Sequence, residues 1–134
     1  MRFRFAAGAI AALAASCIAT PPLSDSAPAV SRIDSVACNA VLLRAANEAG
    51  TLAERRVERM KVMRFASSEA MQAYEDETRL LRLAAVRMGA MIVDISNAAG
   101  IEPDYRYEPA FATEEEGVWS LIKAGDTCAS ELLK

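Results

Sequence analysis

The chain has 134 residues, of which 53% are hydrophobic and 25% are charged, and it contains no histidine. The lack of histidine excludes Ser-His-Asp triads, His-ligated haem or zinc, and an imidazole proton shuttle. The net charge of −3 argues against a nucleic-acid partner, because proteins that bind nucleic acids carry basic patches or domains.

Residues 1–19 have the features of a secretory signal peptide. Arg2 and Arg4 form a basic head, and residues 6–15 (AAGAIAALAA) form an uncharged apolar run followed by small residues. The uncharged stretch of residues 5–20 is shorter than the roughly twenty residues that a membrane-spanning helix needs. We therefore expect an exported protein, located in the periplasm or lipid-anchored in the cell envelope.

Two ways of processing this leader are open. The segment LAASC (residues 13–17) resembles the lipobox of bacterial lipoproteins, in which a small residue precedes a cysteine that is lipidated and becomes the new N-terminus; here Ala14 takes the usual place of leucine. The resemblance implies a lipid anchor on Cys17 and attachment to the membrane. Ordinary cleavage after Ala19 is the alternative, with small residues at the −3 and −1 positions.

The sequence after the leader divides into a linker and one domain. Residues 20–30 (TPPLSDSAPAV) are rich in proline and hydroxyl residues and are expected to form a flexible linker. Residues 31–134 have the length of a single domain. Removing Arg2 and Arg4 with the leader leaves 13 basic against 18 acidic residues, a net charge of −5.

Cys38 and Cys128 remain in the mature chain, near opposite ends of the domain. In an oxidising compartment, an even pair of cysteines is expected to form a disulfide. Closing a loop of about ninety residues would stabilise the domain by about 4–5 kcal/mol in the chain-entropy model. The alternative is a pair of buried, inert thiols.

The domain is predicted to be all-α, since strand signals are almost absent. Ser31 is a candidate N-cap, and apolar residues recur at helical spacing over residues 33–63. Residues 69–99 continue this pattern, with a stretch at residues 83–93 that is apolar nearly all round and is therefore expected to be buried. Gly100 is the expected C-cap.

Two short C-terminal helices are expected to complete the fold. A capping box at residues 113–116 predicts a helix that ends at Gly125, and Asp126 would begin a last turn or two. The predicted architecture is an antiparallel helical hairpin, or small helical bundle, that carries these two helices and follows the signal peptide and the flexible linker.

The chain is expected to reverse near Ser67 or near Gly50. Cys38 lies 29 residues before Ser67 and Ala99 lies 32 residues after it, so both would stand about 45 Å from a turn at Ser67. The C-terminal segment would then start beside Cys38, within reach of a bond to Cys128. A turn at Gly50 would leave one helix of nearly fifty residues, so the spacing favours Ser67.

The motif Met-x-x-Met occurs twice, at Met60 and Met63 and at Met88 and Met91. Side chains three residues apart share a helix face, and two thioethers there can hold a soft ion such as Cu(I). Methionine also fills gaps in helical cores. Because neither histidine nor a longer methionine-rich run accompanies these pairs, we expect core packing and no metal or other cofactor. A periplasmic Cu(I)- or small-ligand-binding helical module is the alternative function.

Arg87 is the one charge in the apolar stretch at residues 83–93. It is expected to pair with a carboxylate, with Asp94, Glu114 and Glu116 as candidates, or to reach water along its apolar stem.

The charges are segregated along the domain. Residues 44–64 are mainly basic and residues 102–116 mainly acidic. Such charged runs usually form solvated faces, and we expect this here. There are two alternatives. The acidic segment could dock on the basic one, or the basic segment could contact anionic lipid or a partner.

The candidate partner-binding surface is Asp104, Tyr105, Arg106 and Tyr107. In an extended conformation the two tyrosines would point to one side, and tyrosine and arginine dominate interaction hot spots. The alternative is that both tyrosines cover the end of the helical core. We therefore expect a non-enzymatic protein that binds an unidentified envelope protein or has a structural role there.

Overall fold

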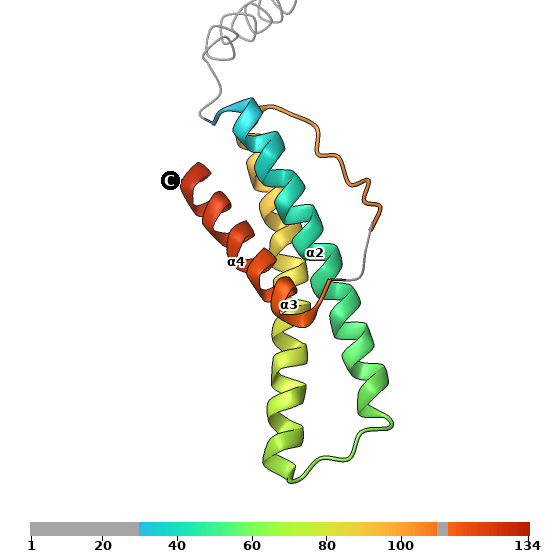
Figure 1. Cartoon of the computed structure of the whole chain (residues 1–134). Coiled ribbons are helices and arrows are strands. Elements are labelled where there is room, and N and C mark those ends of the chain that lie inside the picture. Colours follow the sequence, from blue (N-terminus) through green and yellow to red (C-terminus); the bar gives the residue numbers. More distant parts are fainter. Residues whose placement is uncertain (1–29, 110–112) are drawn as a thin grey trace, which may run out of the picture.

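The computed structural model describes residues 30–109 and 113–134, which contain three α-helices and no strand (Figure 1). Helix α2 comprises Arg32–Met60, α3 comprises Ser68–Ala99 and α4 comprises Glu115–Leu132. The described part of the chain is all-α, as the periodicity of the sequence predicts. The predicted signal peptide with Cys17 lies outside the described residues; of the predicted linker only Val30 is described, and it is buried.

Side-chain caps begin the first two helices. The Ser31 hydroxyl accepts a hydrogen bond from the backbone N–H of Asp34 at 3.3 Å, and the Ser67 hydroxyl accepts one from the backbone N–H of Ala70 at 3.1 Å. These bonds satisfy N–H groups that have no partner within the helix. At the other end of α3, Gly100 adopts φ 65° and ψ 38°, a left-handed conformation in which glycine has no steric penalty.

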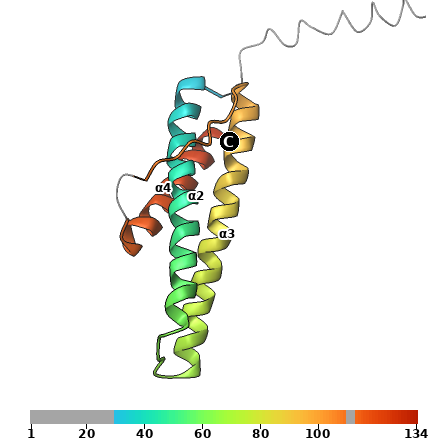
Figure 2. The same ribbon diagram turned by 90° about the vertical axis from the view of Figure 1, so that its right-hand side faces the viewer.

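The chain reverses over residues 61–67, so that α2 and α3 lie side by side and antiparallel (Figures 1 and 2). The reversal at Gly50 that the sequence left open is not found, because Gly50 lies inside α2. A Cβ atom at this position would stand 4.0 Å from the Cβ of Ala85. Gly50 is thus a contact point between α2 and α3, and this packing overrides the local signal for a helix end.

One continuous C-terminal helix is present in place of the two short ones predicted. Helix α4 runs through Gly125 without a break. A Cβ atom at Gly125 would lie 2.8 Å from Sδ of Met88 and 3.1 Å from Cδ2 of Leu42. The prediction was wrong because the absence of a side chain at Gly125 serves the close approach of α4 to the other helices, not a helix end.

The core lies where the three helices meet. Its fully buried large side chains come from all three of them: Leu42, Leu81, Met88, Ile92, Ile95 and Val118. Burying each such side chain contributes roughly 1.5–3 kcal/mol. Helices α2 and α3 continue beyond the start of α4 as a two-helix extension (Figure 1), and Phe65 packs on Tyr74 there with ring centroids 5.5 Å apart.

Helix α3 is apolar on two opposite sides, and only one of them is covered. Met88 and Ile92 are buried, whereas Leu83 and Val86 are 56% and 73% exposed. The expectation that residues 83–93 are buried all round is therefore wrong. Helices α2 and α4 pack on one side of α3 only, and no described segment covers the other side.

Candidate functional site

The segment between α3 and α4 carries the candidate partner-binding residues. Residues 101–109 contain no helix or strand and run beside α2 (Figures 1 and 2). The Tyr107 hydroxyl donates a hydrogen bond to Oε1 of Glu48, a buried residue of α2. Burial, followed by this hydrogen bond, raises the pKa of the Tyr107 phenol above its ordinary value of 10.0. Tyr107 therefore anchors the segment to α2.

Asp104 and Arg106 form an ion pair across Tyr105. Nη2 of Arg106 donates to Oδ2 of Asp104 at 2.8 Å, and Nε of Arg106 donates to Oδ1 at 3.0 Å. The backbone N–H of Arg106 also donates to Oδ1, at 3.1 Å. The guanidinium first, and the backbone N–H next, lower the pKa of Asp104 from 3.8 to about 2. Asp104 and Arg106 thus close a turn around Tyr105, and both charged side chains are exposed.

Tyr105 is 54% exposed, whereas Tyr107 is half-buried. The sequence predicts that both tyrosines point to the same side of the segment. In the structure they have different environments. Tyr107 holds the segment on α2, the Asp104–Arg106 pair shapes it, and Tyr105 is the large side chain left in solvent. The sequence carries no signal for Glu48, which is buried through its contact with this distant segment.

Cys38 and Cys128 form a disulfide, with Cα atoms 5.8 Å apart. Cys38 lies in the N-terminal part of α2 and Cys128 in the C-terminal part of α4. The bond agrees with the pairing expected from the sequence. It fixes one end of α4 on α2.

Arg56 fixes the other end of α4, and sequence reasoning missed it. Its guanidinium donates to Oε1 of Glu115 in α4, to Oε2 of Glu77 at 3.0 Å and to Oγ1 of Thr78 at 3.0 Å. It also stacks on Tyr74, with Cζ 3.8 Å from the ring centroid. The contact with Glu115 shows that the acidic segment does dock, at this point, on the basic stretch of α2.

Arg87 pairs with a carboxylate, as expected, but with none of the three candidates. Nη2 of Arg87 lies 2.9 Å from Oδ2 of Asp126, and both side chains are partly exposed. The sequence predicts a helix start at Asp126, whereas the structure places this residue on the face of a continuous α4. Arg87 has a structural partner at the edge of the bundle and does not line an internal site.

The four methionines of the two Met-x-x-Met motifs do not come together. Met60 lies beside Glu75 and Thr78 in a surface hollow, and Met63 is exposed in the reversal. Met88 is buried against Gly125, ten residues and therefore about 15 Å along α3 from Thr78. Met91 packs at the edge of the core. The thioethers thus belong to separate environments.

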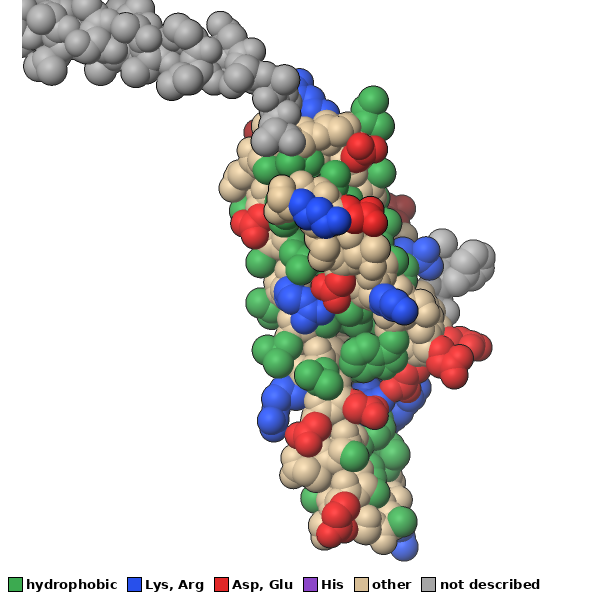
Figure 3. Space-filling model, turned by 90° about the vertical axis from the view of Figure 1, so that its left-hand side faces the viewer, with side chains coloured by type: hydrophobic (Ala, Val, Ile, Leu, Met, Phe, Trp, Pro, Cys, Tyr) green, Lys and Arg blue, Asp and Glu red, His purple; other side chains and the backbone are tan. Residues whose placement is uncertain are grey.

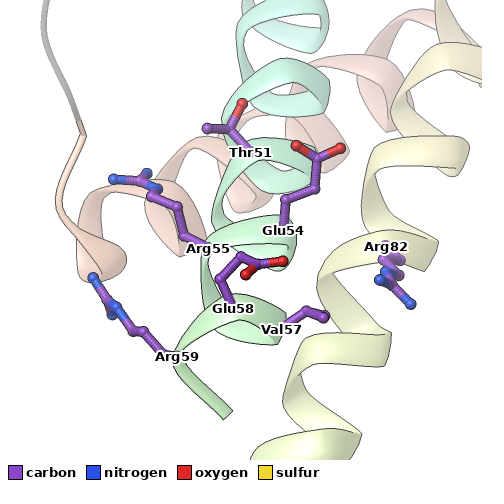
Figure 4. Close-up of a pocket in the computed structure, with 7 residues that line it drawn as sticks. All are labelled: Thr51, Glu54, Arg55, Val57, Glu58, Arg59 and Arg82. Carbon is purple, nitrogen blue, oxygen red and sulfur yellow. The ribbon is translucent and has the colours of Figure 1, made fainter. Parts of the chain in front are cut away.

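A shallow hollow on α2 is lined by charged side chains of both signs (Figure 4). Figure 4 shows Arg55 and Arg59 pointing to one side of α2, and Arg82 of α3 lying on the other side. Glu54 and Glu58 lie between them. The guanidinium groups therefore do not converge on a common point and cannot enclose an anion together.

No family model, no curated protein and no solved structure matches this chain. Within residues 30–109 and 113–134, no three His, Cys, Asp or Glu side chains gather as potential metal ligands. None of the described helices combines the length and the apolarity that a membrane crossing requires.

Proposed function

We propose that this protein is a non-enzymatic binding module of the cell envelope, with Tyr105 at the centre of its contact with another protein. One observation carries the proposal: a tyrosine that is more than half exposed lies within a closed turn, two residues from the anchor at Tyr107. Tyr107 holds one side through Glu48, and the ion pair of Asp104 and Arg106 spans the tyrosine itself.

A fixed segment favours binding for an energetic reason. Ordering a loop at an interface costs free energy, so a loop that is ordered before the encounter retains more of its contact energy as affinity. Tyrosine offers a large contact area with few rotatable bonds and a hydroxyl for a hydrogen bond. Arg106 stands next to it, and the guanidinium N–H groups that do not bind Asp104 can donate to an acceptor on a partner.

Export and lipid attachment belong to the same proposal and are supported by the leader alone. The basic head, the apolar run and the position of Cys17 favour an envelope location with an anchor on Cys17 or cleavage near Ala19. Intact mass of the protein recovered from the producing cell tests both routes. A diacyl adduct on Cys17 supports the anchor, a free N-terminus at Thr20 supports ordinary cleavage, and an uncut leader contradicts export.

Affinity purification from envelope fractions with three matched variants tests the binding surface. Tyr105→Ala should remove a protein that co-purifies with the natural sequence, while the helical CD spectrum is unchanged. Val62→Ala is the control, because Val62 is 82% exposed but lies in the reversal between α2 and α3. Tyr107→Phe should weaken recovery by loosening the segment. Equal recovery with Tyr105→Ala and Val62→Ala would contradict the assignment of Tyr105.

A further inference from the structure

The uncovered side of α3 carries a narrow apolar seam. Leu83, Val86, Ala90 and Val93 follow one another at intervals of three, four and three residues. All four are exposed, and they lie opposite the buried side chains of the same helix. Figure 3 shows hydrophobic side chains along the edge of the molecule on the side where α3 lies, with basic groups beside them.

The spacing of this seam indicates what kind of surface covers it. Apolar residues at alternating intervals of three and four residues form the narrow stripe by which one helix packs along another. The seam runs from Leu83 to Val93, ten residue steps and therefore about 15 Å of helix, or three turns. A helical partner that lies nearly parallel or antiparallel to α3 fits such a stripe.

We propose that the seam of α3 pairs with the same seam in a second copy of this chain, in an antiparallel arrangement around a two-fold axis. With the axis at the level between Val86 and Arg87, Leu83 faces Ala90 of the second copy, and Ala90 faces its Leu83. These two layers each combine a large side chain with a small one. Val86 meets Val86 of the second copy at the axis, as a self-complementary interface requires.

The charges at the ends of the seam support the antiparallel direction. In the register given above, Arg79 stands at the level of Asp94 of the second copy, at both ends of the interface. Asp94 is exposed and forms no ion pair with any described residue. Arg79 has only a long contact of 3.8 Å with Asp76, and both side chains are exposed. In a parallel arrangement, Arg79 would instead stand beside Arg79 of the second copy, and Asp94 beside Asp94 of the second copy.

Arg87 lies close to the axis, where two copies of it would approach each other. Its guanidinium is bound to Asp126 of α4 in the same chain, through Nε at 3.2 Å and Nη2 at 2.9 Å. This ion pair neutralises the charge and directs the side chain toward α4. The repulsion between the two arginines is therefore small.

The length of the seam limits the expected affinity. Stable interfaces bury about 800 Å² on each partner, and three turns of helix cover less than that. We therefore expect a dissociation constant in the micromolar range. The dimer goes beyond the binding function proposed above, because the segment with Tyr105 lies beside α2 (Figure 2) and the seam is on α3.

Sedimentation velocity of the protein, purified as the cell processes it, tests the proposal between about 1 μM and about 500 μM, a range that brackets a micromolar dissociation constant. The natural sequence should shift from monomer to dimer. Val86→Glu should remain monomeric with an unchanged CD spectrum, because it places two carboxylates at the axis. Val62→Glu, at an exposed valine of the reversal, should still dimerise. A monomer at all concentrations, or a dimer that Val86→Glu leaves intact, would overturn the proposal.

A charge exchange tests the direction of the pairing. Arg79→Asp and Asp94→Arg should each weaken the dimer severalfold, and the double exchange should restore it, since the pairs form again with reversed sign. Failure of the double variant to recover would refute the antiparallel register. If the monomer binds vesicles of anionic lipid and Val86→Glu abolishes this, the seam contacts lipid and the second copy is excluded. Tyr105→Ala should leave the dimer unchanged, which separates this test from that of the binding segment.

Discussion

Arg56 shows how one side chain can define the meeting point of three helices. It is 2% exposed and contacts α3 and α4 from within α2. A buried guanidinium is stable only when its donors are satisfied and its charge is matched. Its two carboxylate partners are partly exposed, so they can return to water when the arginine is removed.

Arg56→Ala is expected to lower the free energy of unfolding by about 2 kcal/mol. This is less than the loss from breaking a fully buried pair, because Glu77 and Glu115 can be hydrated in the variant. Urea unfolding followed by CD measures the change. Arg59→Ala is the control and should stay within about 0.5 kcal/mol, since Arg59 is exposed. Equal effects of the two substitutions would show that Arg56 does not join the helices.

The ion pair around Tyr105 makes a prediction about pH. The pKa of Asp104 is lowered from 3.8 to about 2, so the pair is complete above 3.8 and is lost as the pH falls through about 2. The segment should therefore keep one conformation from pH 8 down to pH 4, the range that lies above both values. Carbon-detected NMR titration of the Asp104 carboxyl group measures this.

Arg106→Ala should raise the pKa of Asp104 toward 3.8 without reaching it. The side-chain hydrogen bond is lost, but the backbone N–H of residue 106 still donates to the carboxylate. An unchanged pKa in this variant would show that the guanidinium does not hold Asp104.

At the level of elements, glycines decide how closely the helices approach. Gly125 lies inside α4 at its crossing with α2 and α3, whereas Gly89 lies in α3 at a point where an added Cβ would meet no atom within 4 Å. The same residue type therefore has opposite roles in two helices. In α4 its small size permits packing; in α3 it only lowers the helix propensity.

Gly125→Ala should destabilise the protein by about 1 kcal/mol, because overpacking against Met88 and Leu42 exceeds the gain in helix propensity. Gly89→Ala should stabilise it by about 0.5–1 kcal/mol. Urea unfolding of both variants at one protein concentration measures the difference. Stabilisation by both substitutions would mean that α4 does not pack closely at Gly125.

At the scale of the whole molecule, α4 is held on the α2–α3 pair at two points. The disulfide fixes its C-terminal part and Arg56 contacts its first turn. The polar pair of Asn39 and Ser96, at 2.9 Å and buried, joins α2 and α3 independently of α4. Loss of the disulfide should therefore loosen α4 before it affects the hairpin.

Replacement of both cysteines, Cys38→Ser with Cys128→Ser, should lower the free energy of unfolding by about 4 kcal/mol, from the entropy of a loop of about ninety residues. Hydrogen exchange should rise in α4 more than in α3. Dithiothreitol should have the same effect on the natural sequence and none on the double variant. A natural sequence that does not respond to the reductant, and whose mass shows two free thiols, would contradict the bond.

Local patterns determined much of the fold before any contact was known. Helical periodicity, the cap at Ser31 and the C-cap at Gly100 depend on neighbours within one or two turns, and a sequence displays such neighbours directly. The pairing of Cys38 with Cys128 can also be predicted from the sequence, because only these two cysteines follow the leader and their spacing suits a hairpin. The candidate segment at residues 104–107 was found from its composition, but the separate environments of its tyrosines were not.

Contacts between distant segments decided the rest. Arg56 stands four residues after Leu52, on the buried side of α2. This spacing indicates a buried position, whereas the positive charge of the side chain suggests an exposed one. Gly50 and Gly125 suggest helix ends because glycine is common there. The local sequence does not show that another helix packs closely against each of these glycines. The sequence alone determined which segments are helical and which cysteines can join. Only the tertiary structure decided which glycines are crossings, which arginine is buried and which side of α3 is left uncovered, because each depends on side chains that come together only when the helices pack.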